Sequence, residues 1–170
     1  MMVHAVKPSP TTIDIDIGNE KSMAALSKNM NYEALAKPHE TVREHFRRVD
    51  RGDPRFSDIY TDDIEFYFPK FGFGHGKDAI AELARRLDLE RLEHDIDGLD
   101  IMTSGDRVIV EGREWGTTRE GRTWPDGEIS RGLFCNVFTF RGHLICKLHV
   151  YTDPDFTSSH QEKVQQLHRG

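Results

Sequence analysis

Two ionisable side chains in this sequence lie beside apolar residues, an environment in which proteins often place groups that transfer protons. Asp50 follows Phe46 by four residues and borders the apolar side of a predicted helix, where a carboxylate is costly unless it is paired. His94 alternates with Leu92 and Ile96, so it shares one face of a predicted strand with apolar side chains. Both side chains are therefore candidates for general acid–base chemistry.

A second group of residues is expected to line a pocket for a small molecule. Phe46 lies on the apolar side of its helix, and Cys135 and Val150 lie on strand faces that are predicted to be buried. Trp115 could form a wall for an aromatic ligand, although packing in the core or anchoring of a loop is the alternative role. We therefore predict a pocket whose walls are mainly apolar.

The spacing of the histidines does not predict a metal site. In the segment His39–His45, a zinc-protease motif would need its second histidine four residues after the first, but Arg43 occupies that position. His149 and Asp153 share a strand face, but two ligands are too few for a zinc site. The prediction for metal ions is therefore none.

The elements that position these groups follow from the periodicity of apolar residues. Helical spacing predicts helices over residues 38–51, 55–60 and 77–89. Alternation predicts strands over residues 64–68, 91–101, 108–118, 130–140 and 143–152, with a bulge at Gly98. This order is typical of an α+β fold with helices on one face of a curved sheet. Such a sheet closes into a cone, and its open end is a usual place for a small-molecule pocket.

The last two strands are predicted to form a hairpin with a two-residue turn at Arg141-Gly142. That turn places Phe140 opposite His143. One face of the hairpin is then almost entirely apolar and is expected to be buried; it comprises Leu133, Cys135, Val137, Leu144, Cys146, Leu148 and Val150. Its two cysteines are expected to be packed thiols and not a redox pair. The other face mixes aromatic and polar residues, which suits a subunit interface.

Composition restricts the class of protein. The chain has 170 residues, which fits one domain, and a net charge of −6, which argues against a nucleic-acid partner. No apolar segment is long enough to cross a membrane, and no secretory signal is evident, so we expect a cytoplasmic protein without a membrane partner. We predict an arm over residues 1–31, a domain over residues 32–155 and a tail over residues 156–170.

Several motifs together resemble the NTF2-like superfamily, specifically its SnoaL-like and scytalone-dehydratase-like branches. The resemblance covers residues 32–155 and is carried by the segments Val49–Asp53, Ile59–Phe66, Gly76–Ile80, Gly105–Val108, Trp115–Thr117, Phe140–Ile145 and Tyr151–Asp153. It implies a cone-shaped fold in which a curved, mixed, mostly antiparallel sheet wraps around three N-terminal helices. It also implies a homodimer that forms through the sheet.

The same resemblance implies a chemistry for the candidate residues. In the scytalone-dehydratase-like branch, an Asp at the position of Asp50 orients a His at the position of His94, and the imidazole removes a proton from carbon. SnoaL-like cyclases place an acid–base carboxylate near Asp153, although Asp153 also fits a turn that ends the strand. Ketosteroid-isomerase relatives pair a tyrosine with an acid, which Tyr60 or Tyr67 with Glu114 could imitate.

Two functions follow as expectations. The first is a lyase or isomerase, dehydratase-like or cyclase-like, that needs no cofactor and acts on a small apolar or polyketide-like substrate. The second is a non-catalytic dimeric module that binds a small molecule. Contact between Asp50 and His94 beside an open cavity would support the first function. Separation of the two side chains, or contact without a cavity, would favour a ligand carrier or a site centred on Asp153.

Overall fold

A computed structural model describes residues 37–87, 89–125 and 131–152, all of which belong to one unit of the chain. This part contains two α-helices and an eight-stranded sheet, so the predicted α+β class is confirmed. The prediction of three helices is wrong, because the segment expected to form the second one is a four-residue 3-10 helix, η1 (Phe56–Ile59). The arm and the tail predicted at the two ends of the chain lie outside the described residues.

The first helix is described over residues 37–51 and carries several pocket residues. One side of this helix is buried and carries Val42, His45 and Phe46. His45 and Phe46 follow Val42 by three and four residues, the spacing at which side chains of a helix share one side. Gly52 follows with a φ of 59°, a left-handed conformation that glycine adopts without steric cost. This turn ends the helix directly after Asp50 and Arg51 and leaves Asp50 in the last turn.

The second helix, α2 (Lys77–Arg86), ends three residues before its predicted limit. Leu87 is already extended, and the chain then enters a strand. The apolar side of α2 turns its Ile80 and Leu83 toward the sheet. Within the described ranges, no helix is long and apolar enough to cross a membrane.

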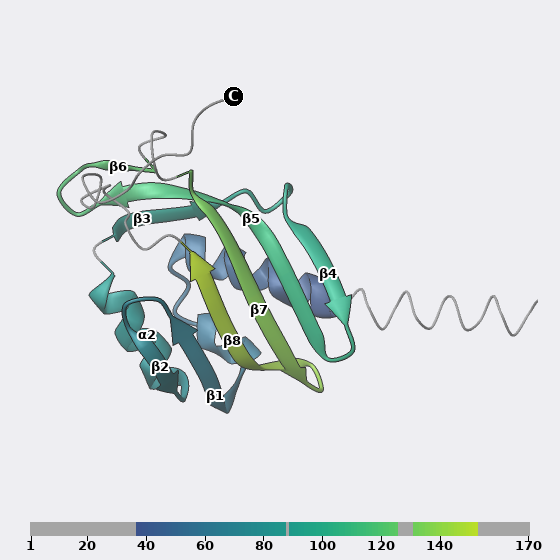
Figure 1. Cartoon of the computed structure of the whole chain (residues 1–170). Helices are drawn as coiled ribbons and strands as arrows, with labels where there is room; N and C mark the ends of the chain where they lie inside the picture. Colours follow the sequence, from purple (N-terminus) through teal and green to yellow (C-terminus); the bar gives the residue numbers. More distant parts are fainter. Residues whose placement is uncertain (1–36, 88, 126–130, 153–170) are drawn as a thin grey trace, which may run out of the picture. The chain divides into compact units, whose positions relative to one another are not determined.

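The sheet is mixed, as predicted, and its strand order is β2-β1-β8-β7-β5-β3, with β4 and β6 also paired to β5 (Figure 1). Only the β1–β8 pair is parallel among the pairs that the structure describes. The strands are β1 (Tyr60–Phe68), β2 (Gly72–His75), β3 (Leu89–His94), β4 (Asp100–Ser104), β5 (Arg107–Thr118), β6 (Thr123–Trp124), β7 (Leu133–Arg141) and β8 (Leu144–Thr152).

The register predicted for the β7–β8 hairpin is wrong. The strands pair Arg141 with Leu144, so the turn is Gly142-His143, and the pairing shifts again between Thr139 and Phe140. The turn displaces the pairing by two residues relative to the prediction, which preserves the faces, and the further one-residue shift reverses which face of β7 lies beside Leu148 and Val150. The inward-facing residues of β7 are consequently Phe134, Asn136, Phe138 and Phe140.

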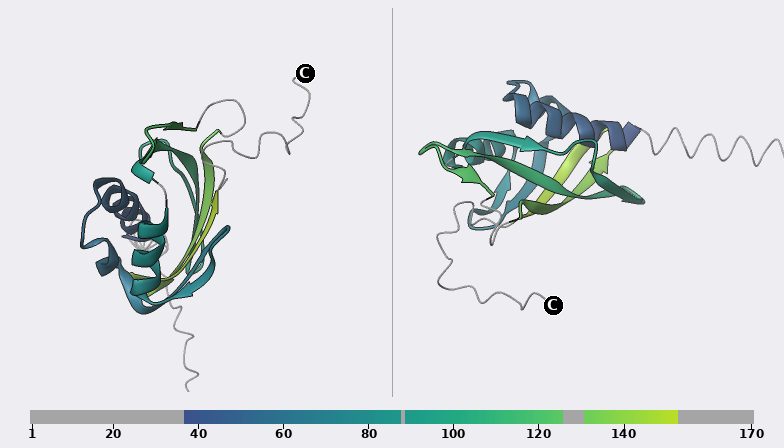
Figure 2. Two further views of the ribbon diagram at one scale, coloured as in Figure 1. Left: turned by 90° about the vertical axis from the view of Figure 1, so that its left-hand side faces the viewer. Right: turned by 90° about the horizontal axis from the view of Figure 1, so that it is seen from above.

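The sheet is strongly curved, and both helices lie on its concave side (Figure 2). The long strand β5 changes partners along its length: its first half pairs with β4 and β7, and its second half pairs with β3 and β6. Instead of the bulge predicted at Gly98, the chain leaves the sheet between β3 and β4. There the carboxylate of Asp95 accepts a hydrogen bond from the backbone N–H of Gly98 at 3.1 Å.

Candidate functional site

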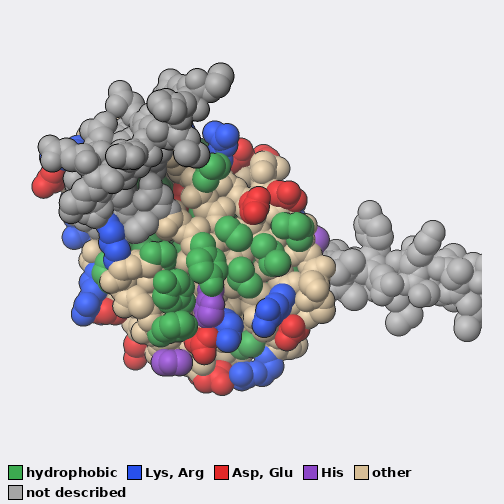
Figure 3. All heavy atoms as spheres, in the orientation of Figure 1, with side chains coloured by type: hydrophobic (Ala, Val, Ile, Leu, Met, Phe, Trp, Pro, Cys, Tyr) green, Lys and Arg blue, Asp and Glu red, His purple; other side chains and the backbone are tan. Residues whose placement is uncertain are grey.

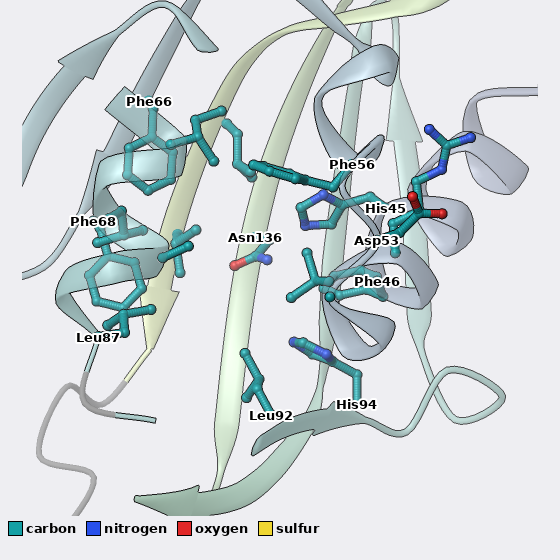
Figure 4. A pocket seen from close by; sticks show the side chains of 18 of the residues that line it. His45, Phe46, Asp53, Phe56, Phe66, Phe68, Leu87, Leu92, His94 and Asn136 are labelled. Carbon is teal, nitrogen blue, oxygen red and sulfur yellow. The ribbon is translucent and has the colours of Figure 1, made fainter. Parts of the chain in front are cut away.

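A cavity of about 330 Å³ lies between the concave face of the sheet and the two helices (Figure 4). Its walls are mainly apolar because the inward-facing positions of β1, β3 and β8 and one side of α2 carry aromatic or aliphatic residues. These are Phe66, Phe68, Ile80, Leu83, Leu87, Leu92, Leu148 and Val150, with Phe56 from η1. Such walls suit a ligand with a large apolar surface.

Polar side chains enter this cavity from three neighbouring strands. His94 of β3 and Glu114 of β5 are direct partners in the sheet, and Asn136 follows on β7. Figure 4 shows the His94 ring and the Asn136 amide pointing into the same pocket. The exposed fractions of the His94 and Glu114 side chains are only 5% and 9%, so their interactions are little screened by water.

Asp50 and His94 are in contact, although 44 residues separate them in the chain. The ring of His94 donates a hydrogen bond from Nδ1 to Oδ1 of Asp50 at 2.5 Å, and its backbone N–H donates to Oδ2 at 3.0 Å. Both carboxylate oxygens are therefore fixed. The contact holds the proton on Nδ1 and turns Nε2 toward the cavity side.

Nε2 of His94 faces a second carboxylate. It lies 3.3 Å from Oε2 of Glu114, and Oε1 of Glu114 accepts a hydrogen bond from the Thr152 hydroxyl at 2.6 Å. Burial alone lowers the pKa of His94. The hydrogen bonds and charges of Asp50 and Glu114 outweigh burial and raise that pKa above the ordinary 6.5.

His45 and Tyr60 form a second polar pair in the cavity wall. His45 Nδ1 and the Tyr60 hydroxyl share a hydrogen bond of 2.6 Å. Burial lowers the pKa of His45 to about 3, helped by the nearby charge of His94, and burial raises the pKa of Tyr60. Both groups are therefore neutral at neutral pH, so they contribute hydrogen bonds and no charge.

Two of these polar residues were not predicted from the sequence. His45 lies three residues after Val42, so its burial could have been recognised from the helical spacing. Asn136 was placed on the wrong face by the incorrect hairpin register. Among the described residues, its Oδ1 is buried with no hydrogen-bond partner, which makes it available to a ligand donor.

The structure brings some of the predicted pocket residues together and separates others. Phe46, Tyr60, Glu114 and Val150 line the cavity. Tyr67, Trp115 and Cys135 belong to the opposite, convex face of the sheet, since their neighbours Phe66, Glu114 and Phe134 point inward. Their assignment to the pocket is therefore corrected. Asp153 lies outside the described residues.

No group of three His, Cys, Asp or Glu side chains in the described part of the chain is arranged to hold a metal ion. Asp50 and Glu114 contact opposite ring nitrogens of His94, so the imidazole separates the two carboxylates. The three groups form a line in which protons can move between neighbours. A cation would need ligands that converge on one point.

Comparisons with known proteins identify relatives of this fold. The sequence profile of the SnoaL-like domain matches residues 42–148. No curated protein matches the chain significantly in sequence. Among solved structures, an NTF2-like protein from Anabaena variabilis is 22% identical, with a TM-score of 0.59 over 72% of this chain and 90% of that one.

Two further structures extend this likeness. A candidate polyketide cyclase from Pseudomonas putida is 17% identical, with a TM-score of 0.59 over 75% of this chain and 98% of that one. TerC, co-crystallised with polyporic acid, is 19% identical, with a TM-score of 0.56 over 74% of this chain and 96% of that one. At these identities the similarity shows the fold alone, which is NTF2-like.

Proposed function

Since the chain belongs to the SnoaL-like family of the NTF2-like fold, we propose that it is a cofactor-independent lyase or isomerase, dehydratase-like or cyclase-like. The Asp50–His94 pair abstracts a proton from a carbon of the substrate. Proton abstraction beside an electron-withdrawing group needs a positioned base and no redox or group-carrying cofactor.

The observation that supports this proposal is the hydrogen bond of 2.5 Å between Asp50 and His94 beside an apolar cavity. Asp50 fixes the tautomer of the imidazole and stabilises the imidazolium that forms when His94 accepts a proton. A structural His–Asp pair would not need an open cavity of about 330 Å³ beside it.

The substrate that fits this cavity is small, mostly apolar, and aromatic or polyketide-like. Phe56, Phe66 and Phe68 supply flat apolar surface, while Asn136 supplies an acceptor at the polar end. The likeness to a candidate polyketide cyclase agrees with this substrate class.

β-Tetralone, an enolisable bicyclic ketone, tests the proposal. Incubation in D₂O is followed by NMR, and the expected result is enzyme-catalysed deuterium exchange at the carbon beside the carbonyl. Replacement His94→Gln should slow this exchange about 10²- to 10⁴-fold, the usual contribution of a general base. His143→Gln, at the exposed β7–β8 turn, is the matched control and should exchange at the wild-type rate.

The pH dependence of this exchange has a defined sign. Only neutral imidazole accepts a proton, so the rate should rise with pH through the raised pKa of His94, above 6.5. Asp50→Asn should lower the maximal rate and move the rise to lower pH, because one of the carboxylates that raise this pKa is gone. Exchange that is independent of His94 would contradict the proposal.

The alternative is a non-catalytic binding module. Binding of β-tetralone, measured by saturation-transfer NMR, without any exchange in the wild-type protein would favour this carrier function.

We also propose that the chain forms a homodimer through the sheet. The convex face carries exposed apolar side chains, visible as the central hydrophobic area in Figure 3; we refer to Phe73, Met102, Trp115, Leu133 and Tyr151 as the convex patch. Aromatic residues in such a patch are typical of protein interfaces.

A further inference from the structure

We infer that Glu114 is the general acid of the same site: it shares one mobile proton with His94 and protonates the hydroxyl group that leaves in the proposed dehydratase-like reaction. This inference rests on the proposed function of Asp50 and His94 and assigns the second half of the reaction.

The position of Glu114 is fixed at both carboxylate oxygens. Oε1 accepts the hydrogen bond from Thr152 at 2.6 Å, and this leaves Oε2 facing Nε2 of His94 at 3.3 Å. Because His94 and Glu114 are direct partners on adjacent antiparallel strands, both side chains enter the cavity from the same wall. A carbon and a neighbouring oxygen of one substrate can therefore contact both residues at once.

The charges around the pair favour one retained proton. The groups that face it are Asp50 and His45 from the first helix, Asn136 from β7 and Thr152 from β8, and of these only Asp50 is a carboxylate. Arg48 and Asp53 also line the cavity, but they are paired with Glu44 and Arg55. When both are carboxylates, Asp50 and Glu114 contribute a charge of −2, and an imidazolium at His94 reduces the net charge of the cluster to −1. Loss of that proton would leave two buried carboxylates without a cation, so the cluster holds it.

The proton can occupy either partner. On Nε2 it gives an imidazolium beside a carboxylate, and after transfer along the Nε2–Oε2 contact it gives a neutral imidazole beside a carboxylic acid. The second arrangement is a base and an acid side by side. It is the form that dehydration requires, because hydroxide is a poor leaving group unless it is protonated.

The step balances without a co-reactant. Neutral His94 takes the proton from the carbon beside the carbonyl, and the C–H electron pair forms the new C=C bond. The C–O bond breaks, and its oxygen takes the proton of Glu114 and leaves as water. The site then holds imidazolium and carboxylate, and transfer of the proton from Nε2 to Oε2 restores the starting form.

The geometry also restricts the substrate. The acid and the base lie on one wall, so the hydrogen and the hydroxyl must leave from the same face of neighbouring carbons. With its single mobile proton, the cluster of Asp50, His94 and Glu114 carries a net negative charge, which disfavours anionic substrates. A neutral compound with a hydroxyl donor fits both this charge and the free Oδ1 of Asn136.

The test compares two reactions of the full-length protein. The aldol adduct of benzaldehyde and acetone is a β-hydroxy ketone whose dehydration is followed by the absorbance of the enone, and it needs both acid and base. Exchange of β-tetralone needs only the base. Glu114→Gln should reduce the ratio of dehydration to exchange about 10²-fold or more. Glu111→Gln, exposed on the same strand, is the control and should leave the ratio unchanged.

The pH profiles supply an independent readout. In the wild type, dehydration should fall with pH as the shared proton is lost, while exchange rises through the same transition. In Glu114→Gln the alkaline fall of dehydration should disappear. Should Glu114→Gln fail to fold, Glu114→Asp serves as the second variant, and it should retain part of the dehydration activity.

The outcomes separate the two proposals. An unchanged ratio in Glu114→Gln, with exchange still dependent on His94, overturns the role of Glu114 and leaves His94 acting alone. Equal loss of both reactions assigns Glu114 a positioning role and also overturns the inference. Loss of the His94 dependence of exchange overturns the proposed function itself.

Discussion

His45 and His94 line the same cavity, and their pKa values are shifted in opposite directions. Both are buried, but only His94 has carboxylate partners on its ring, while His45 shares its hydrogen bond with the neutral Tyr60. Burial without a counter-charge favours the neutral imidazole, and burial between two carboxylates favours the imidazolium. The imidazole is therefore held neutral at position 45 and is favoured in its protonated form at position 94.

This difference predicts how acid destabilises the protein. The unfolded chain binds a proton at His45 near pH 6.5, but the folded protein does so only at about pH 3. The unfolded state thus binds more protons between these values, and the free energy of unfolding should fall as the pH drops below 6.5. At pH 5 the loss attributable to His45 should be about 2 kcal/mol, since each pKa unit corresponds to about 1.4 kcal/mol.

Urea denaturation at pH 7.5 and pH 5 measures this effect. His45→Gln removes the titration, so the variant should lose about 2 kcal/mol less than the wild type between the two pH values. His143→Gln at the exposed turn serves as the control and should behave as the wild type. Equal acid sensitivity of His45→Gln and the wild type would contradict the assignment of a neutral buried His45.

At the scale of elements, the position of His94 depends on the close approach of β3 to β5. Gly116 of β5 is the register partner of Leu92, and a Cβ at Gly116 would collide with the backbone carbonyl of Arg91. Backbone atoms cannot move aside as a flexible side chain can. A larger residue must therefore displace β3, which carries His94 two residues further along.

Gly116→Ala should consequently destabilise the protein by about 1–3 kcal/mol, as overpacking usually does, and should also reduce β-tetralone exchange. Thermal unfolding and the exchange rate are the two measurements. Gly142→Ala is the comparison, because it has a φ of 66° but no atoms near the added methyl group. It should lower stability by about 1 kcal/mol and leave exchange intact. Similar exchange rates in both variants would argue against this role of Gly116.

The hairpin of β7 and β8 shows where pattern alone was insufficient. Both faces of β7 carry large apolar residues, so alternation identified a strand without showing which face is buried. The turn position and the irregular pairing between Thr139 and Phe140 decided the register. As a result, the sequence placed Cys135 inside, whereas the structure places Asn136 there.

For the whole molecule, the convex patch predicts self-association. Five large hydrophobic side chains are exposed on the face of the sheet opposite the cavity and the helices. Size-exclusion chromatography with light scattering should give the mass of a dimer. Leu133→Lys, which places a charge in the patch, should give the mass of a monomer, about 20 kDa.

A control on the helical side distinguishes a specific interface from general loss of solubility. Arg85→Ala changes an exposed residue of α2 and should remain dimeric. A wild-type monomer at all tested concentrations, or a dimer that survives Leu133→Lys, would rule out association through this face.

Local sequence determined the first helix, α2 and the long strands, because helical spacing, alternation and turn residues act over a few neighbours. It did not predict the short strands β2 and β6, and it predicted an α-helix where the structure has η1. It also marked Asp50 and His94 as separate candidates, and the resemblance to known families suggested their pairing. The tertiary structure alone decided that Glu114 lies against the second nitrogen of His94, and that Asn136 is part of the cavity wall. These contacts depend on sheet curvature and strand register, which are set by long-range pairing and by pairing shifts that no local pattern encodes.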